Sequence, residues 1–304
     1  MQPPPEFQEQ VVEEVKEGKW EECQSNSDQI LAAGLETLLT ADLNTIGEAA
    51  QSGTGIYLFY TDEEYLYIGE TLDLRKRLAQ HLRPSEKSVF MKNYRDYLQG
   101  TQTLPGIDIE ETFTIAQKNV YYDAISVSFG RKELEEYGII NLPAVLNRFQ
   151  IKARRYTRRK EVDLELWSEC QRMTETLLCE GGQILFAQSS NFWSDTQPPN
   201  LPGIYLVINE EEPVYIGETT NLFERYKTHS TDTYFSALRK NVGRTLFNAE
   251  FIKPKRFAAN VDRQIDVFLS ECTYQFFAVQ LGRRELEEIL INKFQPKFNR
   301  KTST

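Results

Sequence analysis

The chain has 304 residues, of which 40% are hydrophobic and 12% aromatic, which is enough to build two domains with their own cores. Its formal net charge of −10 and its sequence pI of about 5.0 argue against a general nucleic-acid binder, because such proteins usually carry a basic face. The four cysteines lack metal-ligand spacing, no apolar signal segment is present, and no apolar run approaches the roughly 18 residues of a membrane span. We therefore expect a protein of the reducing cytoplasm with no membrane partner.

The first half opens with a proline-rich tail and a helical leader. Three consecutive prolines cannot continue a helix or a ladder, so residues 1–7 are predicted to be flexible. Apolar residues then recur at three- and four-residue intervals from about residue 11 to residue 40, which predicts helix. Gly18 and the polar cluster at 25–27 are expected to split this leader into two helices.

The elements that follow predict a small sheet with helices around it. Strands are expected at residues 55–60, 65–68, 112–116 and 124–129. An acidic turn joins the first two strands, which are expected to pair antiparallel. A helix then extends from about Thr71 to Leu82, and Gly130 introduces another helix.

This pattern occurs twice in the chain. The segment GIYLFYTDEEYLYIGETLDLRKRLAQH at 55–81 returns as GIYLVINEEEPVYIGETTNLFERYKTH at 203–229, with each motif position 148 residues later. In both copies a second tyrosine follows the first by ten residues, an arginine follows the last glycine by eight, and a histidine follows by four more. The only two histidines of the chain occupy this position. The leader repeats as well, because WEECQ at 20–24 reappears as WSECQ at 167–171.

The repeat predicts two domains after the flexible tail. The first unit is expected at residues 8–150 and includes its helical leader. The second is expected at residues 151–304, with a basic linker and a leader of its own.

The repeated motif resembles that of a known enzyme family. Gly55-Ile56-Tyr57 with Tyr67-Ile68-Gly69, followed by Arg77 and His81, is similar to the GIY-YIG nuclease family, which includes homing endonucleases, some restriction enzymes and the bacterial excision-repair incision nuclease. The resemblance covers the core of each half. It implies an α/β fold of the α+β type with two tandem GIY-YIG units. Each unit is expected to be a small, mostly antiparallel three-stranded sheet flanked by helices, with a helical leader before it.

The resemblance also implies a metal-ligand helix late in each copy. In the family a glutamate precedes Leu-Ile and a downstream Pro-x-aromatic-Asn, which matches Glu287, Leu290-Ile291 and the segment 296–299. The shared GR(K/R)ELEE start places Glu135 opposite Glu287. The candidate catalytic residues are therefore Tyr57, Tyr67, Arg77, His81 and Glu135 in the first copy and Tyr205, Tyr215, Arg225, His229 and Glu287 in the second.

The two glutamates are the candidate metal ligands. A carboxylate suits Mg²⁺ (or Mn²⁺), since Mg²⁺ prefers oxygen ligands and often keeps several waters, so one glutamate and a substrate phosphate could hold it. The alternative is an acidic first helical turn favoured by the helix macrodipole, which needs no metal. The family spacing favours the metal.

An arginine on a helix face beside a tyrosine-lined sheet can hold a phosphate oxygen and neutralise the charge that develops during phosphodiester cleavage. The simpler interpretation makes Arg77 one more solvated charge beside Arg75 and Lys76. That interpretation gives no reason for the same position in Arg225, so we favour the phosphate-binding role.

Hydrolysis also needs a base that takes a proton from water, and the candidates are the motif tyrosines. A free phenol, with a pKa of about 10, is a poor base, so cationic groups and a metal would have to lower its pKa. The resemblance makes the GIY tyrosine the base and leaves the other tyrosine to orient water or phosphate. Each tyrosine could instead serve packing, and each histidine could make a structural hydrogen bond rather than contact phosphate.

Contacts to nucleic acid are expected from a basic linker. Residues 148–160 carry seven basic side chains and no acidic one, although a solvated linker is an equally good interpretation. The candidate nucleic-acid-binding residues are Arg154, Arg155, Arg158, Arg159 and Lys160 of this linker, together with Asn147 and its counterpart Asn299.

Three features of the sequence depart from the family pattern. Glu70 and Glu218 follow the YIG glycines, where an acidic group opposes a substrate phosphate. Gly138 and the early Pro143 are expected to loosen the helix that supports Glu135, which favours the second site if one site alone is active.

We therefore expect a metal-dependent endonuclease that cuts double-stranded DNA with two active sites in one chain, so that a monomer acts as a pseudo-dimer. One alternative is a nucleic-acid-binding or regulatory protein that keeps the scaffold without the activity. Another is a protein-interaction scaffold that uses its acidic surface. The presence of tyrosine, arginine, histidine and glutamate in both copies favours chemistry.

Overall fold

The computed structural model describes residues 18–41, 44–45, 52–82, 89–101, 119–147 and 162–299. The predicted flexible tail, the predicted strand at 112–116 and the basic stretch at 148–160 lie outside these residues. Within the described residues no helix is long and apolar enough to cross a membrane.

The chain divides into two compact units, each with one copy of the motif. The unit that we call the first-copy unit runs from Asn26 to Thr174. The second-copy unit combines the residues up to Ser25 with those from Glu175 onward.

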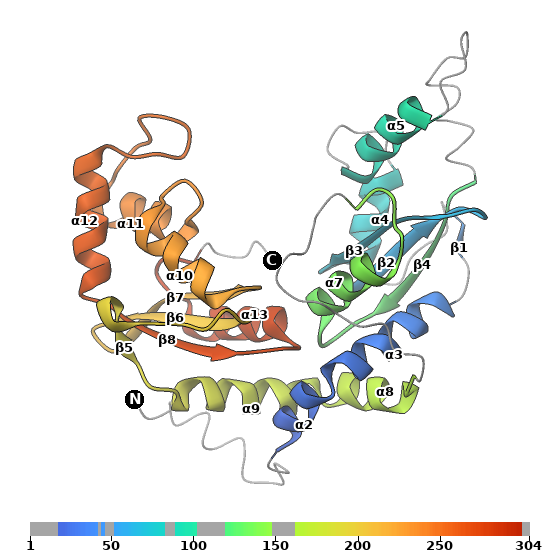
Figure 1. Cartoon of the computed structure of the whole chain (residues 1–304), viewed down its shortest axis with the longest axis horizontal. Helices are drawn as coiled ribbons and strands as arrows, with labels where there is room; N and C mark the ends of the chain where they lie inside the picture. The colour runs from blue at the N-terminus through green and yellow to red at the C-terminus, as the bar shows by residue number, and fades with distance from the viewer. Residues whose placement is uncertain are drawn as a thin grey trace. The chain divides into compact units, whose positions relative to one another are not determined.

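The first-copy unit is a four-stranded antiparallel sheet with helices packed on it (Figure 1). The sheet order is β1-β4-β2-β3, so β3 lies at an edge. Its elements are α3 (Ser27–Leu39), β1 (Asn44–Thr45), β2 (Gly55–Tyr60), β3 (Tyr65–Thr71), α4 (Leu74–Leu82), α5 (Val89–Thr101), β4 (Tyr121–Ser126), α7 (Arg131–Asn141) and α8 (Leu164–Arg172).

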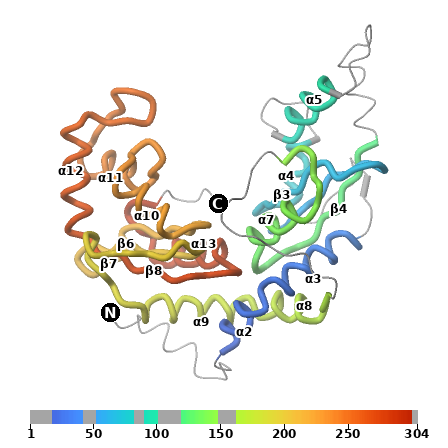
Figure 2. Tube along the Cα trace, in the orientation of Figure 1, coloured from blue at the N-terminus to red at the C-terminus, as the bar shows by residue number. Residues whose placement is uncertain are grey.

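The second-copy unit repeats this plan, with sheet order β5-β8-β6-β7 and β7 at the edge. Figure 2 follows its backbone trace from β6 through the helices to α13. Its elements are α2 (Lys19–Ser25), α9 (Thr174–Ala187), β5 (Asn191–Phe192), the 3-10 helix η1 (Trp193–Asp195), β6 (Gly203–Asn209), β7 (Glu212–Thr219), α10 (Leu222–Thr231), α11 (Ala237–Phe247), α12 (Ala259–Ser270), β8 (Thr273–Ala278) and α13 (Arg283–Phe294).

The α+β fold class and the two repeated units are confirmed, and each sheet gains a fourth strand of two residues at its edge. The strand expected at 124–129 instead spans Tyr121–Ser126, where β4 pairs with the whole of β2. Val127 and Phe129 lie beyond the last residue of β4 that pairs with β2, but both are fully buried. Their burial explains why the apolar alternation continues past the strand. The alternation therefore indicated burial rather than strand pairing at this end.

Side-chain alternation along β2 and β3 gives the first-copy sheet two different faces. Tyr57 and His81 of α4 meet on one face, whereas Ile68 points to the other face and contacts α7. The space there is so narrow that a Cβ added to Gly138 of α7 would lie 2.3 Å from the Ile68 side chain. Gly138 thus permits close packing of α7 on β3 and does not loosen it, contrary to the sequence-based expectation.

The leader splits into two helices, α2 and α3, as expected, but the two helices belong to different compact units. Although α2 directly precedes α3 along the chain, it packs on α9 of the second-copy unit (Figure 1), where Trp20 lies over Gly181. In the first-copy unit Trp167 of α8 lies over Gly34 of α3 in the same way. The division at 8–150 and 151–304 therefore describes the sequence repeat, whereas each compact unit contains one leader helix from the opposite copy.

The contact between Gly34 and Trp167 provides a stability test. A Cβ at Gly34 would lie 2.7 Å from the indole ring, so Gly34→Ala overpacks this contact. Gly100 of α5 is a matched helical control, because a Cβ there would meet nothing within 4 Å. We expect Gly100→Ala to raise the free energy of unfolding, measured by urea denaturation, by about 0.5–1 kcal/mol. The free energy of unfolding of Gly34→Ala should be lower than that of the control variant by about 1–3 kcal/mol. Equal values for the two variants would contradict the packing.

Candidate active sites

In the first copy a tyrosine, a histidine and an arginine meet on one face of the sheet. The Tyr57 phenol oxygen on β2 lies 2.9 Å from His81 Nε2, and Arg77 Nε donates a hydrogen bond to it at 3.2 Å. Arg77 and His81 are four residues apart on α4, so they share one face of that helix. The motif spacing therefore directs both side chains to the same phenol.

The second copy has the same arrangement. Tyr205 lies 2.8 Å from His229 Nε2 and accepts a hydrogen bond from Arg225 Nε at 3.2 Å. Both arginines are half-buried, whereas Arg75 is exposed. The interpretation of Arg77 as one more solvated charge therefore does not describe its place in the structure.

Burial sets the protonation states of these groups. Tyr57 and Tyr205 are fully buried, and burial raises the pKa of each phenol well above its ordinary value despite the adjacent arginine. Burial, followed by the charge of Arg77, lowers the pKa of His81 to about 3. Burial and nearby arginines likewise lower the pKa of His229. At neutral pH the phenols are therefore protonated and the imidazoles neutral.

These protonation states fix the direction of the hydrogen bonds. Because Tyr205 accepts a hydrogen bond from Arg225, its own O–H donates to the neutral His229 Nε2, so the single N–H of the imidazole is on Nδ1. Nδ1 lies 2.7 Å from Ser236 Oγ, which also accepts the backbone N–H of Arg239 at 3.0 Å. A phenol proton can therefore move to the imidazole along an existing hydrogen bond.

The candidate metal ligands reach the same region from the opposite side of the edge strand. Glu135 Oε1 of α7 accepts the backbone N–H of Glu70, which follows the YIG glycine, at 3.3 Å. Gly69 itself lies against the phenol, since a Cβ there would be 2.5 Å from the Tyr57 oxygen. The charge of Glu135 also raises the pKa of Tyr67, after burial. The structure thus brings the phenols and the carboxylate together around a glycine.

The second copy matches this geometry. Glu287 Oε1 of α13 accepts the Glu218 N–H at 3.1 Å, and a Cβ at Gly217 would lie 2.3 Å from the Tyr205 oxygen. Burial, followed by the charge of Glu218, raises the pKa of Glu287 to about 7. Its charge in turn raises the pKa of Tyr215, after burial.

Two buried arginines that the sequence analysis did not select neutralise the acidic residues after the YIG glycines. Arg131 Nε forms an ion pair with Glu70 at 2.8 Å, and Arg283 Nε lies 3.8 Å from Glu218. Each arginine directly follows the glycine of the shared GR(K/R)ELEE segment, so the repeat contained the signal. Each arginine therefore offsets part of the charge that was expected to oppose phosphate, more closely in the first copy than in the second.

Within the described residues no group of three or more histidine, cysteine, aspartate or glutamate side chains could hold a metal. Each site instead offers one largely buried glutamate carboxylate on a helix, which binds the backbone N–H of the glutamate after the YIG glycine. Such oxygen donors fit Mg²⁺, which often binds through one or two carboxylates and keeps several waters. The second oxygen of each candidate ligand carboxylate accepts a hydrogen bond, from Lys132 in the first copy and from Arg284 in the second.

The asparagines expected to contact nucleic acid hold the edge strands instead. Asn147 accepts the N–H of Ile68 and donates to its carbonyl, both at 2.9 Å. Asn299 makes the same pair of bonds to Ile216, at 2.8 and 2.7 Å. Because both ends of each amide are occupied, these side chains position the YIG strand. The basic candidates 154–160 lie outside the described residues.

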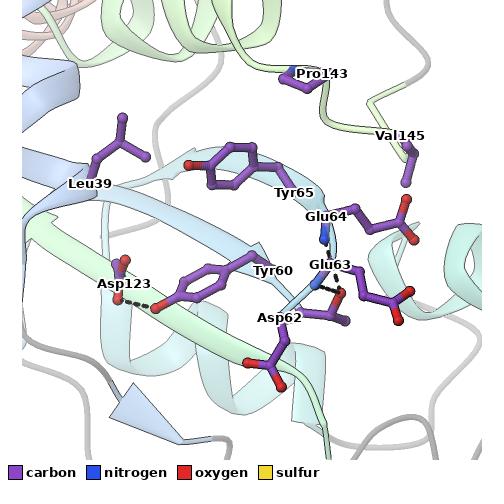
Figure 3. Close-up of a pocket in the computed structure, with 10 residues that line it drawn as sticks. Leu39, Tyr60, Asp62, Glu63, Glu64, Tyr65, Asp123, Pro143 and Val145 are labelled. Atoms are coloured by element: carbon purple, nitrogen blue, oxygen red, sulfur yellow. Dashed lines mark hydrogen bonds between the residues drawn. The ribbon is translucent and has the colours of Figure 1, made fainter.

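A separate cavity of about 640 Å³ lies at the other end of the β2–β3 hairpin (Figure 3). The acidic turn at 61–64 lines it together with Tyr60, Tyr65 and Asp123. The Tyr60 hydroxyl donates to Asp123 Oδ1 at 2.9 Å, as the dashed line in Figure 3 marks. None of the candidate catalytic residues lines this cavity.

Comparison with known proteins identifies relatives of both copies. The GIY-YIG catalytic domain family matches residues 54–114 and 201–301, which together exceed half of the chain. The UvrABC system protein C of Hydrogenobaculum sp. (strain Y04AAS1) is 38% identical over 47 residues, which are 16% of this chain and 8% of that protein. The chain thus spans less than a tenth of the length of that curated relative.

Two solved structures are also similar to part of the chain. Both are the GIY-YIG N-terminal endonuclease domain of UvrC from Thermotoga maritima, one bound to magnesium and the other a point mutant bound to its catalytic divalent cation. Each is 24% identical and covers 34% of this chain. The matches span 88% and 89% of those chains, with TM-scores of 0.22 and 0.23.

The neutral imidazoles predict a pH dependence of stability. The pKa of His81 falls from its ordinary value of 6.5 to about 3 on folding, so the unfolded chain binds more protons once the pH drops below 6.5. We expect the first-copy unit to lose about 2 kcal/mol of unfolding free energy between pH 7 and pH 5 on this account.

His81→Gln removes the titrating group and keeps a polar side chain. Urea denaturation at both pH values should show that the loss shrinks by that amount in the variant. A loss as large in His81→Gln as in the wild type would contradict a neutral buried His81.

Proposed function

The chain belongs to the GIY-YIG family, with a catalytic domain in each half, and on this basis we propose that it is an endonuclease that hydrolyses phosphodiester bonds of double-stranded DNA. The observation that carries the proposal is the shared cluster around the YIG glycine. Phenol, imidazole, guanidinium and carboxylate have the same partners in both copies, with matching distances agreeing to within about 0.2 Å.

The arginine binds the phosphate that is cut. Its Nε is held by the GIY tyrosine, which fixes the plane of the guanidinium. In the first copy Arg77 Nη1 makes a 3.5 Å contact with Gln80 at the exposed surface, and a phosphate oxygen can replace so long a contact. Nitrogens in this position stabilise the negative charge that builds up on the phosphate during attack.

Glu135 and Glu287 are the residues that would hold Mg²⁺ or Mn²⁺ in the two sites. When bound, such an ion supplies Lewis-acid stabilisation of the phosphate oxygens. For the glutamate to serve as a ligand, the ion pair with Lys132 or Arg284 has to open or share its oxygen. Both cations lie three residues before their glutamate on the helix surface, and they can swing toward solvent.

The GIY tyrosine accepts the proton of the attacking water in this proposal. Burial disfavours a free phenolate, so Tyr57 passes its own proton to His81 Nε2 as it takes up the new one. A bound phosphate favours the resulting imidazolium because the two carry opposite charges. Tyr67 is 9% exposed, lies nearer to solvent than the fully buried Tyr57, and orients the water.

Two sites in one chain suit a substrate with two strands, so the protein would act as a covalent pseudo-dimer. One observation favours a second candidate function, a nucleic-acid-binding or regulatory protein without activity. The ion pairs that engage both ligand carboxylates would suit a cluster that is kept for structure rather than for metal binding.

Plasmid cleavage tests the proposal. Wild type with supercoiled plasmid and Mg²⁺ or Mn²⁺ should give linear product, whereas Arg77→Ala and Arg225→Ala should each give mainly nicked circles. Each substitution should slow its own site by about 100- to 1,000-fold, the usual effect of losing one donor to a developing charge. The double variant should leave the plasmid intact, and Arg75→Ala, an exposed arginine on the same helix, should cut like the wild type.

Two outcomes would contradict the proposal of an endonuclease with two active sites. Linear product from both single variants would contradict paired sites. Retained DNA binding without cleavage of DNA or RNA at any metal condition would favour the inactive binding protein.

A further inference from the structure

The leader repeat ends in a glutamine whose contacts the proposed function does not use. Gln24 closes the WEECQ segment in α2, and Gln171 closes WSECQ in α8. Both side chains bond to backbone in their own compact unit, and that unit contains the opposite copy of the motif.

Gln24 is bound to two consecutive backbone residues of the second-copy unit. Its Oε1 accepts the N–H groups of Gln280 at 2.7 Å and Leu281 at 3.0 Å. Its Nε2 donates to the carbonyl of Leu281 at 2.9 Å. One side-chain amide thus satisfies three backbone groups just beyond the end of β8.

Gln171 makes the same three bonds in the first-copy unit. Its Oε1 accepts from the N–H groups of Ser128 at 2.8 Å and Phe129 at 3.1 Å, and its Nε2 donates to the Phe129 carbonyl at 2.9 Å. The match between the two copies shows that these bonds belong to the repeat and are not incidental surface contacts.

We call the two residues that each glutamine binds, 280–281 and 128–129, the clamped segment. It lies directly before the glutamate helix, the helix that carries the candidate metal ligand (α13 or α7). It is followed at once by Gly282 or Gly130, with φ of 89° and 80°, where the chain turns from the strand into α13 or α7. The candidate metal ligand lies five residues after each glycine. Because a short turn joins the clamped segment to this helix, fixing the backbone before the turn restrains the position of the first helical turns. The position of the glutamate carboxylate relative to the YIG strand is restrained with them.

We propose that Gln24 and Gln171 are positioning residues, each of which holds the glutamate helix of the opposite copy, so that neither copy forms a complete site alone. Gln24 of the first leader serves the site with Glu287, and Gln171 of the second leader serves the site with Glu135. The catalytic consequence rests on the proposed function, whereas the clamp on the helix can be tested without it.

Other contacts attach α2 without Gln24, which separates positioning from simple docking. Trp20 packs on Gly181, and its backbone N–H donates to the buried Glu180 Oε2 at 2.6 Å. Gln24→Ala therefore removes the clamp and leaves this attachment. Gln24→Glu keeps both acceptor bonds and loses the donated one, so it is the conservative variant.

Hydrogen exchange on the full chain tests the clamp directly. In Gln24→Ala we expect the amides of Gln280 and Leu281 to exchange about 5- to 10-fold faster, the effect of losing a typical net hydrogen bond. Gln24→Glu should restore most of their protection. Gln171→Ala should have its effect at Ser128 and Phe129 instead. Unchanged exchange at the clamped amides, or loss of protection spread over the whole unit, would overturn the proposal.

Cleavage by variants that keep one active site tests whether each glutamine affects the site of the opposite copy. In Arg77→Ala, where the second site remains, Gln24→Ala should lower nicking about 10-fold and more strongly than Gln171→Ala does. In Arg225→Ala the order should reverse, and the loss should appear in kcat rather than KM. An uncrossed pattern, or full activity despite lost amide protection, would overturn the positioning role. If the wild type cleaves nothing, the proposed function fails and hydrogen exchange alone decides the clamp.

Discussion

The buried hydrogen bond between the GIY tyrosine and the motif histidine is the interaction on which each unit depends. It joins the central strand to the following helix and places the arginine four residues earlier against the same phenol. Because both partners are buried, the phenol stays protonated and the imidazole neutral. The same buried bond therefore holds the strand to the helix and supplies the path for the proton transfer that we propose, so the structural and the functional interpretation of these residues do not exclude each other.

The edge strand that carries YIG is the meeting point of the remaining parts. In the first copy Asn147, which follows α7, binds the backbone N–H and carbonyl of the isoleucine in YIG. Glu135 of α7 accepts the backbone N–H of the residue just beyond the glycine. The glycine has no side chain, so the phenol can lie against the strand. An edge strand offers free backbone groups that attract any pairing partner, and here side chains occupy them.

Ion pairs beside each site offset part of the acidic charge of the chain there. The glutamates after YIG are paired with buried arginines at the start of the glutamate helices, so the net charge of −10 does not describe the environment of the sites. Exchange of the leader helices adds a second layer, because the backbone before each glutamate helix is held by a glutamine from the other copy. Two similar units thus share parts as the subunits of a dimer would, within one chain.

The sequence by itself determined the family, the two units, most of the strands and helices, and the residues that meet at each phenol, because these follow from local spacing along one strand and one helix. It did not determine the ends of β4, the partners of Asn147 or the buried Arg131, because burial and pairing across the sheet decide those. Nor could it assign α2 to the second-copy unit, because each unit has a helical glycine against which the tryptophan of a leader helix packs. Only the tertiary structure shows which glycine each tryptophan meets, because that pairing joins segments far apart in the chain.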